Sequence, residues 1–506
     1  MIAKEDRKFF IVTLLIFLAL LGLPYLLAAQ GAGPEHVFTG LLVNPLDGNS
    51  YLAKMREGWR GEWLFTLPYI FETSATVPFH LPYILLGHVA CVLGLALVPV
   101  FHVARLAAAA FLLWALYSFM AALFPPGAGR RWAFLLASFG SGLGWLAVAG
   151  GGFTPDFWVG EAYPFLASYS NVHFPLGLGL QLLLLTPGDG VPDARRLGGV
   201  ALLALCLALV SAFSVPVVGV VLGGVWLLDI AQKRPARAAF WQAAAVTLGG
   251  APLLLYDLWA IGRDPLLMGW NAQNITALPP LWELLVAFSP ALLLAAPGVW
   301  FALRRAAQNW RVVAVWAVVC PLLAAIPFAL QRRFLVGYFI PLAALVVFAL
   351  GAWLSEKGAG RARLALFLLA LPTNLILLLT AIFAARTLAP ELYLTRGEHA
   401  AYAWIEANTP AGARLLAGPD TGLFIPAYTD ARVYYGHPFE SLDAAQREAE
   451  LLAFYAAPDA AFVHALDVEY LYYGPREAAL GPLPDLPGLS LLYDELGVKI
   501  YAVSTP

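Results

Sequence analysis

The sequence predicts a multi-pass α-helical membrane protein that ends in a small soluble α/β domain. Of its 506 residues, 61% are hydrophobic and 12% are charged, whereas soluble domains carry about a quarter charged residues. The apolar residues come in blocks of roughly twenty, the length that a helix needs to cross about 30 Å of hydrocarbon. After Ala384 this pattern gives way to short mixed segments. The net charge of −2 gives no indication of nucleic-acid binding.

The apolar blocks predict about eleven transmembrane helices. The first follows the charged stretch "KEDRK" and resembles a secretory signal, but its apolar run is longer than a typical signal core, so we expect a retained span. The expected spans cover residues 9–29, 101–124, 132–149, 174–185, 197–212, 217–230, 238–261, 281–303, 312–330, 334–353 and 364–384. The three cysteines fall inside apolar runs, which indicates small core residues and no disulfide framework.

The basic residues of the short loops predict the orientation in the plasma membrane. With a cytoplasmic N-terminus, one face collects almost all of them, as the positive-inside rule requires. These residues are Lys4, Arg7, Lys8, Arg130, Arg131, Arg195, Arg196, Lys233, Arg234, Arg237, Arg304, Arg305, Arg311, Lys357, Arg361 and Arg363. Counting residues 81–97 as a further span would invert this pattern. A helix along the outer interface is therefore preferred there, with a true span as the alternative.

Two domains are expected. Residues 1–388 form the transmembrane domain, with a long first outer loop at 30–100 and a second outer loop at 150–173. Residues 389–506 form a soluble extracytoplasmic α/β domain, which opens with Thr395 and Glu398 in capping-box spacing. Strands are expected at "ARLLAG", "RVYYG", "VEYLYYG" and "LSLLYDELGVKIYAV", and a helix at "LDAAQREAELLAFYA". The stretch "GPDTGLF" is expected to be a turn.

Acidic residues in the two outer loops are the first candidates for a site. In "NPLDGNSYLAKM", the simplest role for Asp47 is turn chemistry, with Asp47, Asn49 or Ser50 capping the following helix. A catalytic or metal-binding carboxylate is the alternative, and both roles are compatible. The second loop offers Asp156, Glu161 and His173 among aromatic residues, which suit either an interfacial belt or a platform for a sugar.

An arginine pair, Arg332 and Arg333, lies where two expected spans meet on the outer face. This position opposes the positive-inside bias and therefore needs a reason. The arginines either extend toward lipid head groups or bind an anion, and Arg presents a rigid fork that matches phosphate oxygens. A phosphate site is the preferred interpretation. His437 and Glu440 in "YYGHPFES" either face a site or end a strand.

Together these features resemble the GT-C superfamily of integral membrane glycosyltransferases. The resemblance rests on the architecture, on "RRFLVGYFIPL" with Arg333, Phe334 and Pro341, and on "WIEANTPAGARLLA", which is similar to the tails of bacterial members. It implies transfer of a sugar from a polyprenyl-phosphate donor to an acceptor glycan, lipid or protein at the outer face of the bilayer, with inversion. Several branches carry paired acids in the first loop, where this chain has Asp47 alone.

Within that resemblance, Asp47 is expected to be the catalytic carboxylate and Arg332 and Arg333 the donor phosphate site. Asp156, Glu161 and His173 are expected at an acceptor or secondary site. No cofactor is certain. A divalent cation, Mg²⁺ or Mn²⁺, shared by Asp47 with Glu161 or Asp156 stays open. The alternatives are a transporter or flippase for a lipid-linked or anionic substrate, and a non-catalytic partner in envelope-polysaccharide assembly.

Overall fold

The computed structural model describes the chain except residues 1, 3, 187–189, 305–307, 484–485 and 505–506. It divides into two compact units, each described here by itself. The helical unit comprises Met1–Pro24, Val103–Tyr256 and Ile275–Ala381, and the mixed unit comprises Tyr25–His102, Asp257–Asn274 and Ile382–Pro506. The mixed unit thus gathers the first predicted loop and the C-terminal segment. The predicted domain boundary at 388/389 stays a prediction.

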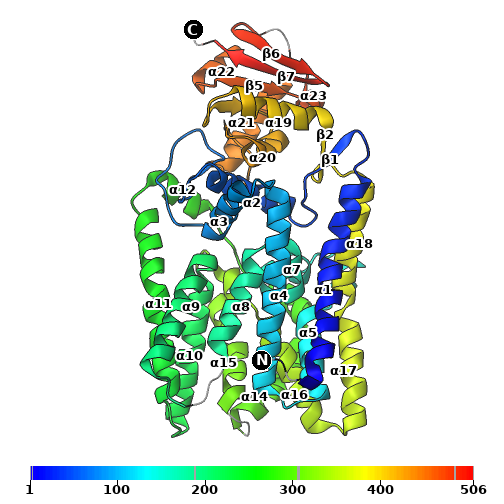
Figure 1. Cartoon of the computed structure of the whole chain (residues 1–506), viewed down its shortest axis with the longest axis vertical. Coiled ribbons are helices and arrows are strands. Elements are labelled where there is room, and N and C mark those ends of the chain that lie inside the picture. The colour runs from blue at the N-terminus through cyan, green and yellow to red at the C-terminus, as the bar shows by residue number, and fades with distance from the viewer. Residues whose placement is uncertain (1, 3, 187–189, 305–307, 484–485, 505–506) are drawn as a thin grey trace. The chain divides into compact units, whose positions relative to one another are not determined.

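The helical unit is built from helices of very different length (Figure 1). Those that lie wholly within it are α5 (Ala128–Phe139), α6 (Gly144–Val148), η1 (Pro155–Phe157), η2 (Gly160–Ala162), α7 (Pro164–Ser170), α8 (His173–Leu185), α9 (Ala194–Val210), α10 (Ser214–Ala231), α13 (Leu281–Phe288), α14 (Ala291–Arg304), α15 (Gln308–Ala324), η3 (Gln331–Leu335), α16 (Phe339–Trp353) and α17 (Glu356–Ala370). Parts of α1 (Lys4–Gly31), α4 (Leu97–Leu123), α11 (Arg237–Ile261) and α18 (Pro372–Arg386) also belong to it.

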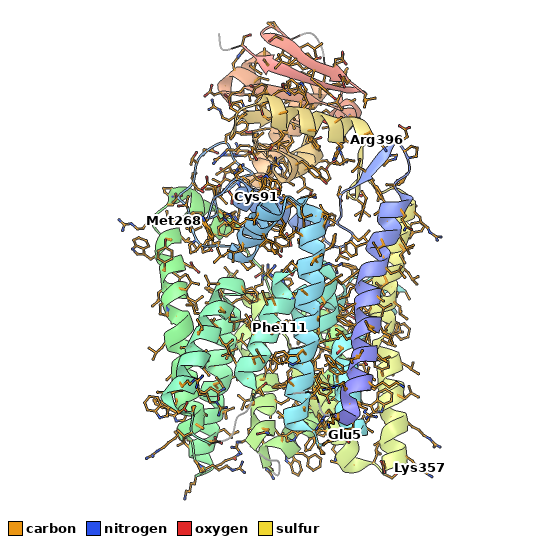
Figure 2. All side chains as sticks on the ribbon, in the orientation of Figure 1. Glu5, Cys91, Phe111, Met268, Lys357 and Arg396 are labelled. Atoms are coloured by element: carbon orange, nitrogen blue, oxygen red, sulfur yellow. The ribbon has the colours of Figure 1, made fainter. Side chains whose placement is uncertain are left out.

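Every expected apolar span contains helix in the structure, but several are interrupted or end early, with non-helical residues at 140–143, 289–290 and 325–330. Among the described residues, six helical segments are long and apolar enough to cross a membrane, and the bent pair α13–α14, with its 77° angle, raises the number to seven. The helices at the expected spans 174–185 and 197–212 have 13 and 17 residues and are too short to count among these six. The expected span at 132–149 is divided between α5 and α6, and α15 ends at Ala324, before the expected end at 330. Side chains project outward all along the helices in Figure 2, and exposed apolar ones include Leu15, Leu255 and Leu379. The chain is a multi-pass helical membrane protein.

Close helix packing in this unit depends on small residues, as is typical of membrane proteins. A Cβ added to Gly298 of α14 would lie 2.5 Å from the Leu345 carbonyl oxygen of α16, so only glycine permits this approach. Of the expected core cysteines, Cys320 is buried, but Cys91 in the mixed unit is exposed (Figure 2). All three cysteines are free.

Two of the basic residues used to predict orientation are buried and paired in the helical unit. Arg130 lies 3.3 Å from the fully buried Asp6 carboxylate, which also accepts a hydrogen bond from the Tyr117 hydroxyl. Arg311 lies 2.8 Å from the buried Asp229 carboxylate. Removing one partner of such a pair would leave an uncompensated buried charge. These two arginines therefore hold helices together whatever their effect on orientation.

The mixed unit contains two β-sheets in the described part of the chain. Strand β1 (His36–Phe38) pairs antiparallel with β2 (Tyr393–Thr395). The second sheet has the order β4-β3-β5-β7-β6, with β3 parallel to β4 and β5, and β7 antiparallel to β5 and β6. Its strands are β3 (Arg414–Leu416), β4 (Arg432–Val433), β5 (Tyr470–Tyr473), β6 (Leu489–Glu495) and β7 (Val498–Val503). Each segment expected to be extended contains a strand, and the last one forms two, β6 and β7.

Helices cover this second sheet in the mixed unit (Figure 1). They are α19 (Arg396–Asn408), α20 (Pro419–Tyr428), α21 (Ala444–Ala456), α22 (Ala460–Ala465) and α23 (Pro475–Leu480). The capping box at Thr395 and Glu398 is confirmed, as is the helix expected before Ala456. The turn expected at "GPDTGLF" is wrong. Gly418 precedes α20, and Pro419 opens it at the first helical position, where its missing N–H costs nothing.

The first loop contributes α2 (Pro45–Trp59) and α3 (Leu81–Leu93) to the mixed unit, beside α12 (Pro265–Gln273). The α2 and α3 backbones touch, because a Cβ added to Gly87 would lie 1.8 Å from the Met55 carbonyl oxygen. The rings of Tyr51 and Tyr83 stack at 4.4 Å across the same contact. At 13 residues, α3 is about 20 Å long, shorter than the bilayer core. This length favours the interfacial helix over a span.

Candidate functional site

Asp47 lies in the first turn of α2, where the local chemistry is that of a helix start. Asn44, in a left-handed conformation with φ 48°, is the N-cap, and its side-chain oxygen accepts from the Asp47 N–H at 3.3 Å. The Asn44 amide in turn donates to Asp47 Oδ2 at 2.6 Å. The expectation that Asp47, Asn49 or Ser50 caps this helix is wrong, because the helix begins at Pro45. The Asp47 side chain is 37% exposed, so its carboxylate reaches solvent.

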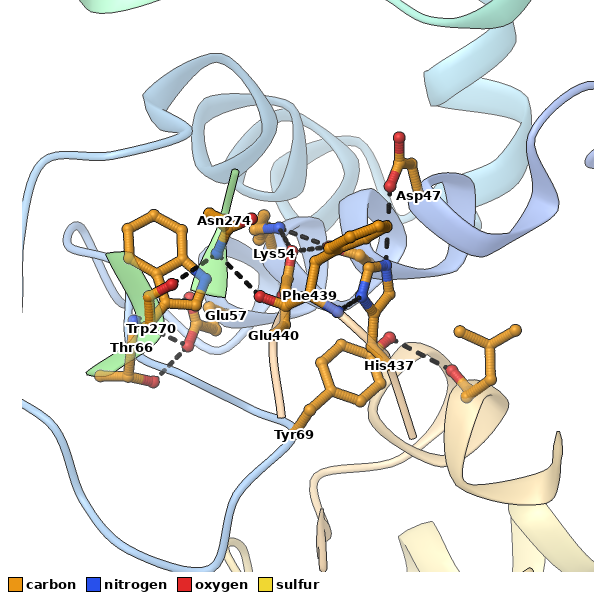
Figure 3. Close-up of polar contacts among 12 residues, drawn as sticks. Asp47, Lys54, Glu57, Thr66, Tyr69, Trp270, Asn274, His437, Phe439 and Glu440 are labelled. Atoms are coloured by element: carbon orange, nitrogen blue, oxygen red, sulfur yellow. Dashed lines mark hydrogen bonds and ion pairs between the residues drawn. The ribbon is translucent and has the colours of Figure 1, made fainter. Parts of the chain in front are cut away.

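His437 faces the other oxygen of that carboxylate. Its Nε2 lies 3.6 Å from Asp47 Oδ1, and its side chain is only 1% exposed (Figure 3). The Phe439 N–H donates to His437 Nδ1 at 3.1 Å. The Tyr69 ring lies 5.6 Å from the imidazole, centre to centre, and packs beside it. The neighbour of the Asp47 carboxylate in the mixed unit therefore comes from the C-terminal segment. Asp156 and Glu161 of the second loop, expected to share a cation with Asp47, belong to the helical unit.

Glu440, three residues after His437, makes a second contact with α2. Its Oε1 accepts from Lys54 Nζ at 2.5 Å and from the Ser50 hydroxyl (Figure 3). Lys54 is completely buried. Burial alone would raise the pKa of Glu440, but the charge of Lys54 and the hydrogen bonds from Lys54 and Ser50 hold it below the usual value. We call Ser50, Lys54 and Glu440 the clamp.

The clamp and the Asp47–His437 contact share one face of α2. Asp47, Ser50 and Lys54 are spaced i, i+3 and i+7, so they point to the same side of the helix. The loop at 436–441 contacts this face of α2. Hydrogen bonds within the loop stabilise it, because the N–H groups of Gly436 and His437 both donate to the Ser441 hydroxyl, at 3.1 and 3.2 Å. A rigid loop thus carries both side chains that contact α2.

Glu57 is a further buried acid of α2, one turn after Lys54. It accepts from the Thr66 N–H at 3.2 Å and from the Thr66 hydroxyl. Burial raises the pKa of Glu57 to about 7, although these hydrogen bonds and the charges of Arg60 and Lys54 oppose the shift. Its protonation therefore changes near neutral pH.

The arginine pair lies in the helical unit, on the short helix η3, and Glu161 of η2 is its acidic partner. Glu161 Oε1 lies 3.5 Å from Arg332 Nε and 3.3 Å from Arg333 Nη1. The Glu161 carbonyl also accepts from the Gly337 N–H at 2.8 Å, which ties the second loop to the segment after η3. The carboxylate is 2% exposed, while the two arginines are 19% and 26% exposed.

Aromatic rings support both guanidinium groups. Arg332 lies over the Trp158 ring, 4.8 Å from its centroid. Arg333 lies over Phe174 and Phe213, at 5.7 and 5.5 Å. Stacking of this kind orients the planar forks. Among the described residues, the ion pairs of the two arginines are both with Glu161, so two positive charges share one carboxylate at a partly exposed surface, which suits an anion.

Asp156 and His173 lie in the same unit but have other contacts. The Asp156 carboxylate is fully buried and accepts from the Gly144 N–H, the Thr154 hydroxyl and the Thr373 hydroxyl, at 3.0, 2.6 and 3.0 Å. Burial raises its pKa, and these donors oppose the shift. Such contacts favour a structural role that joins η1 to α6 and α18. His173 opens α8 and its ring lies 4.3 Å from that of Phe174, a ring that also supports Arg333.

The acids present within either unit do not fit a divalent cation. Among the described residues, no group of three or more His, Cys, Asp or Glu side chains is arranged to hold a metal ion. Asp156 faces hydrogen-bond donors, Glu161 faces guanidinium groups, and Asp47 faces an amide and an imidazole. A cation shared by Asp47 with Glu161 or Asp156 would join the two units and stays a prediction. We derive no step through a metal.

The structure therefore brings the predicted residues together in two groups, Asp47 with His437 in the mixed unit and Glu161 with Arg332 and Arg333 in the helical unit. Sequence reasoning did not identify Lys54, and it considered Ser50 only as a helix cap and Trp158 only as one of the aromatics of the second loop. The spacing of Ser50 and Lys54 relative to Asp47 was a usable signal, because it marks one polar face on the helix that begins at Pro45. Nothing in the sequence pointed to Trp158 in particular among the aromatics of the second loop.

Comparison with known proteins identifies the fold. No protein-family model and no curated protein sequence matches the chain. Among solved structures, it is similar to the oligosaccharyltransferase AglB from Archaeoglobus fulgidus in complex with an inhibitory peptide and a dolichol-phosphate, at 13% identity and a TM-score of 0.53 over 96% of this chain and 74% of that one. It is also similar to ArnT from Cupriavidus metallidurans bound to undecaprenyl phosphate, at 15% identity and a TM-score of 0.53 over 100% of both chains.

A third similar structure is the arabinofuranosyltransferase AftD from Mycobacteria, at 16% identity and a TM-score of 0.55, covering 99% of this chain and 40% of that one. At such identities the likeness is one of fold. It spans nearly the whole chain in each case, so it includes both the helices and the C-terminal sheet. The chain has the GT-C fold that the resemblance in sequence predicted.

Proposed function

We propose that the chain is a membrane glycosyltransferase that moves a sugar from a polyprenyl-phosphate donor to an acceptor at the extracytoplasmic face. The observation that carries the proposal is the surplus positive charge of the arginine pair. Arg332 and Arg333 share one carboxylate, lie over aromatic rings and stay partly exposed. This arrangement suits a phosphate, because guanidinium groups match its oxygens with paired N–H donors.

The fold supports a lipid-linked phosphate as the anion. The AglB and ArnT structures were determined with a dolichol-phosphate and with undecaprenyl phosphate, respectively. A phosphate on a polyprenyl chain would enter from the bilayer, where the exposed apolar helices of this chain lie. A transporter or an assembly partner would need no reactive carboxylate. The fold and the paired Asp47 together favour the enzyme.

In the proposed reaction, the acceptor hydroxyl attacks the anomeric carbon while the bond to the lipid phosphate breaks. Asp47 accepts the hydroxyl proton as general base. Arg332 and Arg333 stabilise the negative charge that grows on the departing phosphate, which as a good leaving group needs no general acid. Inversion at the anomeric carbon follows from a single displacement. Glu161 orients the two guanidinium groups, and His173 at the start of α8 is proposed on the acceptor side.

The proposed sidedness follows from the basic residues of the short loops, with the N-terminus in the cytoplasm and the C-terminal segment outside the plasma membrane. The acceptor is then a glycan, lipid or protein of the cell envelope. In that arrangement the mixed unit, with Asp47, is exposed to the compartment that holds the acceptor.

A transfer assay tests the proposal. The purified chain in lipid nanodiscs is supplied with radiolabelled polyprenyl-phosphate sugars and a panel of envelope acceptors. We expect transfer by the native chain, a loss of about 10²-fold or more for Asp47→Asn, and about 10²-fold for Arg333→Ala. Arg361→Ala, which changes an exposed arginine away from both groups, is the matched control and should transfer normally.

Two outcomes would count against the proposal. Full transfer by both Asp47→Asn and Arg333→Ala would show that these side chains are not the site. No transfer by the native chain with any of the donors, combined with movement of the labelled lipid between leaflets, would favour the flippase.

A further inference from the structure

We infer that His437 is a positioning residue for Asp47, holding the catalytic carboxylate with an Nε2–H that the structure prevents from moving to the other ring nitrogen. The inference rests on the proposed function in one respect, because it takes Asp47 as the general base. It adds that the C-terminal segment, through the loop at 436–441, supplies a side chain to the reaction.

The tautomer of His437 is determined by its backbone neighbour. The Phe439 N–H donates to Nδ1 at 3.1 Å, so Nδ1 must be the acceptor nitrogen. In a neutral imidazole the proton then sits on Nε2, which is the nitrogen that faces Asp47. A proton on Nδ1 would place two N–H groups against each other. The ring therefore presents a donor to the carboxylate.

Among the described residues, the Asp47 carboxylate is the acceptor that the His437 Nε2–H group faces. In the part of the chain that the structure describes, the buried His437 Nε2 has no hydrogen-bond partner within normal distance, and Asp47 Oδ1 lies 3.6 Å away. A buried N–H without a partner is costly, so a small closure onto the carboxylate is favourable. Contacts of catalytic groups are often long before substrate binds and tighten in the reacting complex.

The carboxylate would then be held from both sides. The Asn44 amide donates to Oδ2 at 2.6 Å. On the other side His437 faces Oδ1, the contact drawn in Figure 3. Each carboxylate oxygen can accept more than one hydrogen bond, so this arrangement orients Asp47 and still lets it receive a proton from the acceptor hydroxyl. A base held in one rotamer meets the reacting proton without a search over conformations.

The clamp explains why His437 stays in place. Glu440 is joined to Ser50 and Lys54, which lie on the same face of α2 as Asp47. Because His437 and Glu440 are three residues apart on a loop tied to Ser441, the position of one determines that of the other. The buried ion pair between Lys54 and Glu440 thus fixes the position of the loop along α2. Fixing the register of two packed segments is the best-attested role of buried charges in proteins.

Two substitutions at one position separate positioning from packing. In His437→Gln the side-chain amide nitrogen reaches the place of Nε2 and keeps a donor toward Asp47. In His437→Asn the amide reaches only the place of Nδ1. We expect the kcat of the Asn variant to fall roughly 10- to 100-fold with the donor KM little changed, the loss of a hydrogen bond to a charged group. The His437→Gln variant should keep kcat within about threefold of the native value.

The control is His399→Gln, at an exposed position of α19, which should match the native chain. Equal kcat values for His437→Gln and His437→Asn would overturn the inference.

A second measurement does not depend on turnover. With ¹⁵N-histidine incorporated, NMR spectra of the chain in nanodiscs report the tautomer of each imidazole, and His437→Gln assigns the signal by its loss. We expect an Nε2–H tautomer whose Nε2 signal shifts in Asp47→Asn. An Nδ1–H tautomer, or a signal that Asp47→Asn leaves unchanged, would overturn the inference. If the native chain transfers no sugar, the proposed function fails, while the NMR result still decides whether His437 holds Asp47.

Discussion

The clamp in the mixed unit and the arginine cluster in the helical unit both set a cation against a buried glutamate, yet they differ in charge balance and exposure. In the clamp one lysine meets one glutamate, and Lys54 is fully buried. In the cluster Arg332 and Arg333 meet the single carboxylate of Glu161, and both arginines stay partly exposed. A balanced, buried pair joins two parts of a fold, whereas a surplus charge at the surface is available to a ligand.

This difference in burial and charge balance predicts that the clamp affects the stability of the fold and that the cluster affects the affinity for an anion. Burying a charge costs desolvation free energy that an exposed group does not lose in full. Breaking the clamp should therefore destabilise the protein, while breaking the cluster should weaken anion binding. The following predictions test this contrast, from the largest expected effect to the smallest.

Lys54→Met should be the most destabilising of these changes. It leaves the Glu440 carboxylate buried without its cation, at a cost of about 3–5 kcal/mol in the free energy of unfolding. The double variant Lys54→Met with Glu440→Gln removes both charges and should recover most of that loss. Arg333→Met should cost about 1 kcal/mol or less, because Arg332 still faces Glu161. Thermal unfolding in detergent measures all three, and equal losses for Lys54→Met and Arg333→Met would remove the contrast.

The buried position of Glu57, on the same helix as the clamp, should make stability depend on pH. Its pKa is about 7 in the folded protein and 4.5 without burial. Between these values the folded state keeps a proton that the unfolded state has lost, so stability falls as pH rises from about 4.5 to 7 and then levels. The loss amounts to about 3 kcal/mol at most. Glu57→Gln should flatten this part of the curve, and unfolding at pH 5.5 and 8 measures it; an unchanged slope would place the titration elsewhere.

A polyprenyl phosphate without sugar should stabilise the native chain through the arginine cluster. A ligand at 100 times its Kd adds about 2.7 kcal/mol to the free energy of unfolding. The double variant Arg332→Met with Arg333→Met should lose this gain in the free energy of unfolding. Lys54→Met, although less stable without ligand, should show the same gain when the ligand is added. The dephosphorylated alcohol is the control and should stabilise neither chain. Equal stabilisation of native chain and double variant would move the phosphate site away from the arginines.

Glu161→Gln tests whether charge or orientation dominates in the cluster. Removing the carboxylate raises the surplus charge from one to two while keeping the shape of the side chain. If charge dominates, as we expect, the phosphate should bind roughly fivefold more tightly, or about 1 kcal/mol. Weaker binding would mean that Glu161 acts mainly by holding the two forks in place. Native mass spectrometry with titrated polyprenyl phosphate measures the change.

Much of the fold could be predicted because it depends on local composition. Apolar runs of sufficient length become helices in a bilayer whatever surrounds them, since every backbone group must be satisfied within the segment. The strands of the C-terminal segment and the capping box at Thr395 were recognisable for the same reason. The helix expected at 312–330 shows the limit, because α15 ends at Ala324 and apolar length alone does not say where a helix ends.

The site was only half visible in the sequence. Asp47, Arg332 and Arg333 could be selected individually, because a lone acid in an outer loop and a basic pair on the wrong face are local anomalies. That Asp47 meets His437, 390 residues later along the chain, and that Glu161 rather than Asp156 meets the arginines, depends on long-range packing. Composition and spacing carry no information on which distant segments touch. The sequence alone thus determined most of the helical segments, the strands of the C-terminal sheet and the candidate residues. Only the tertiary structure decided their partners, because a contact between distant segments arises from the packing of the whole chain rather than from the residues beside it.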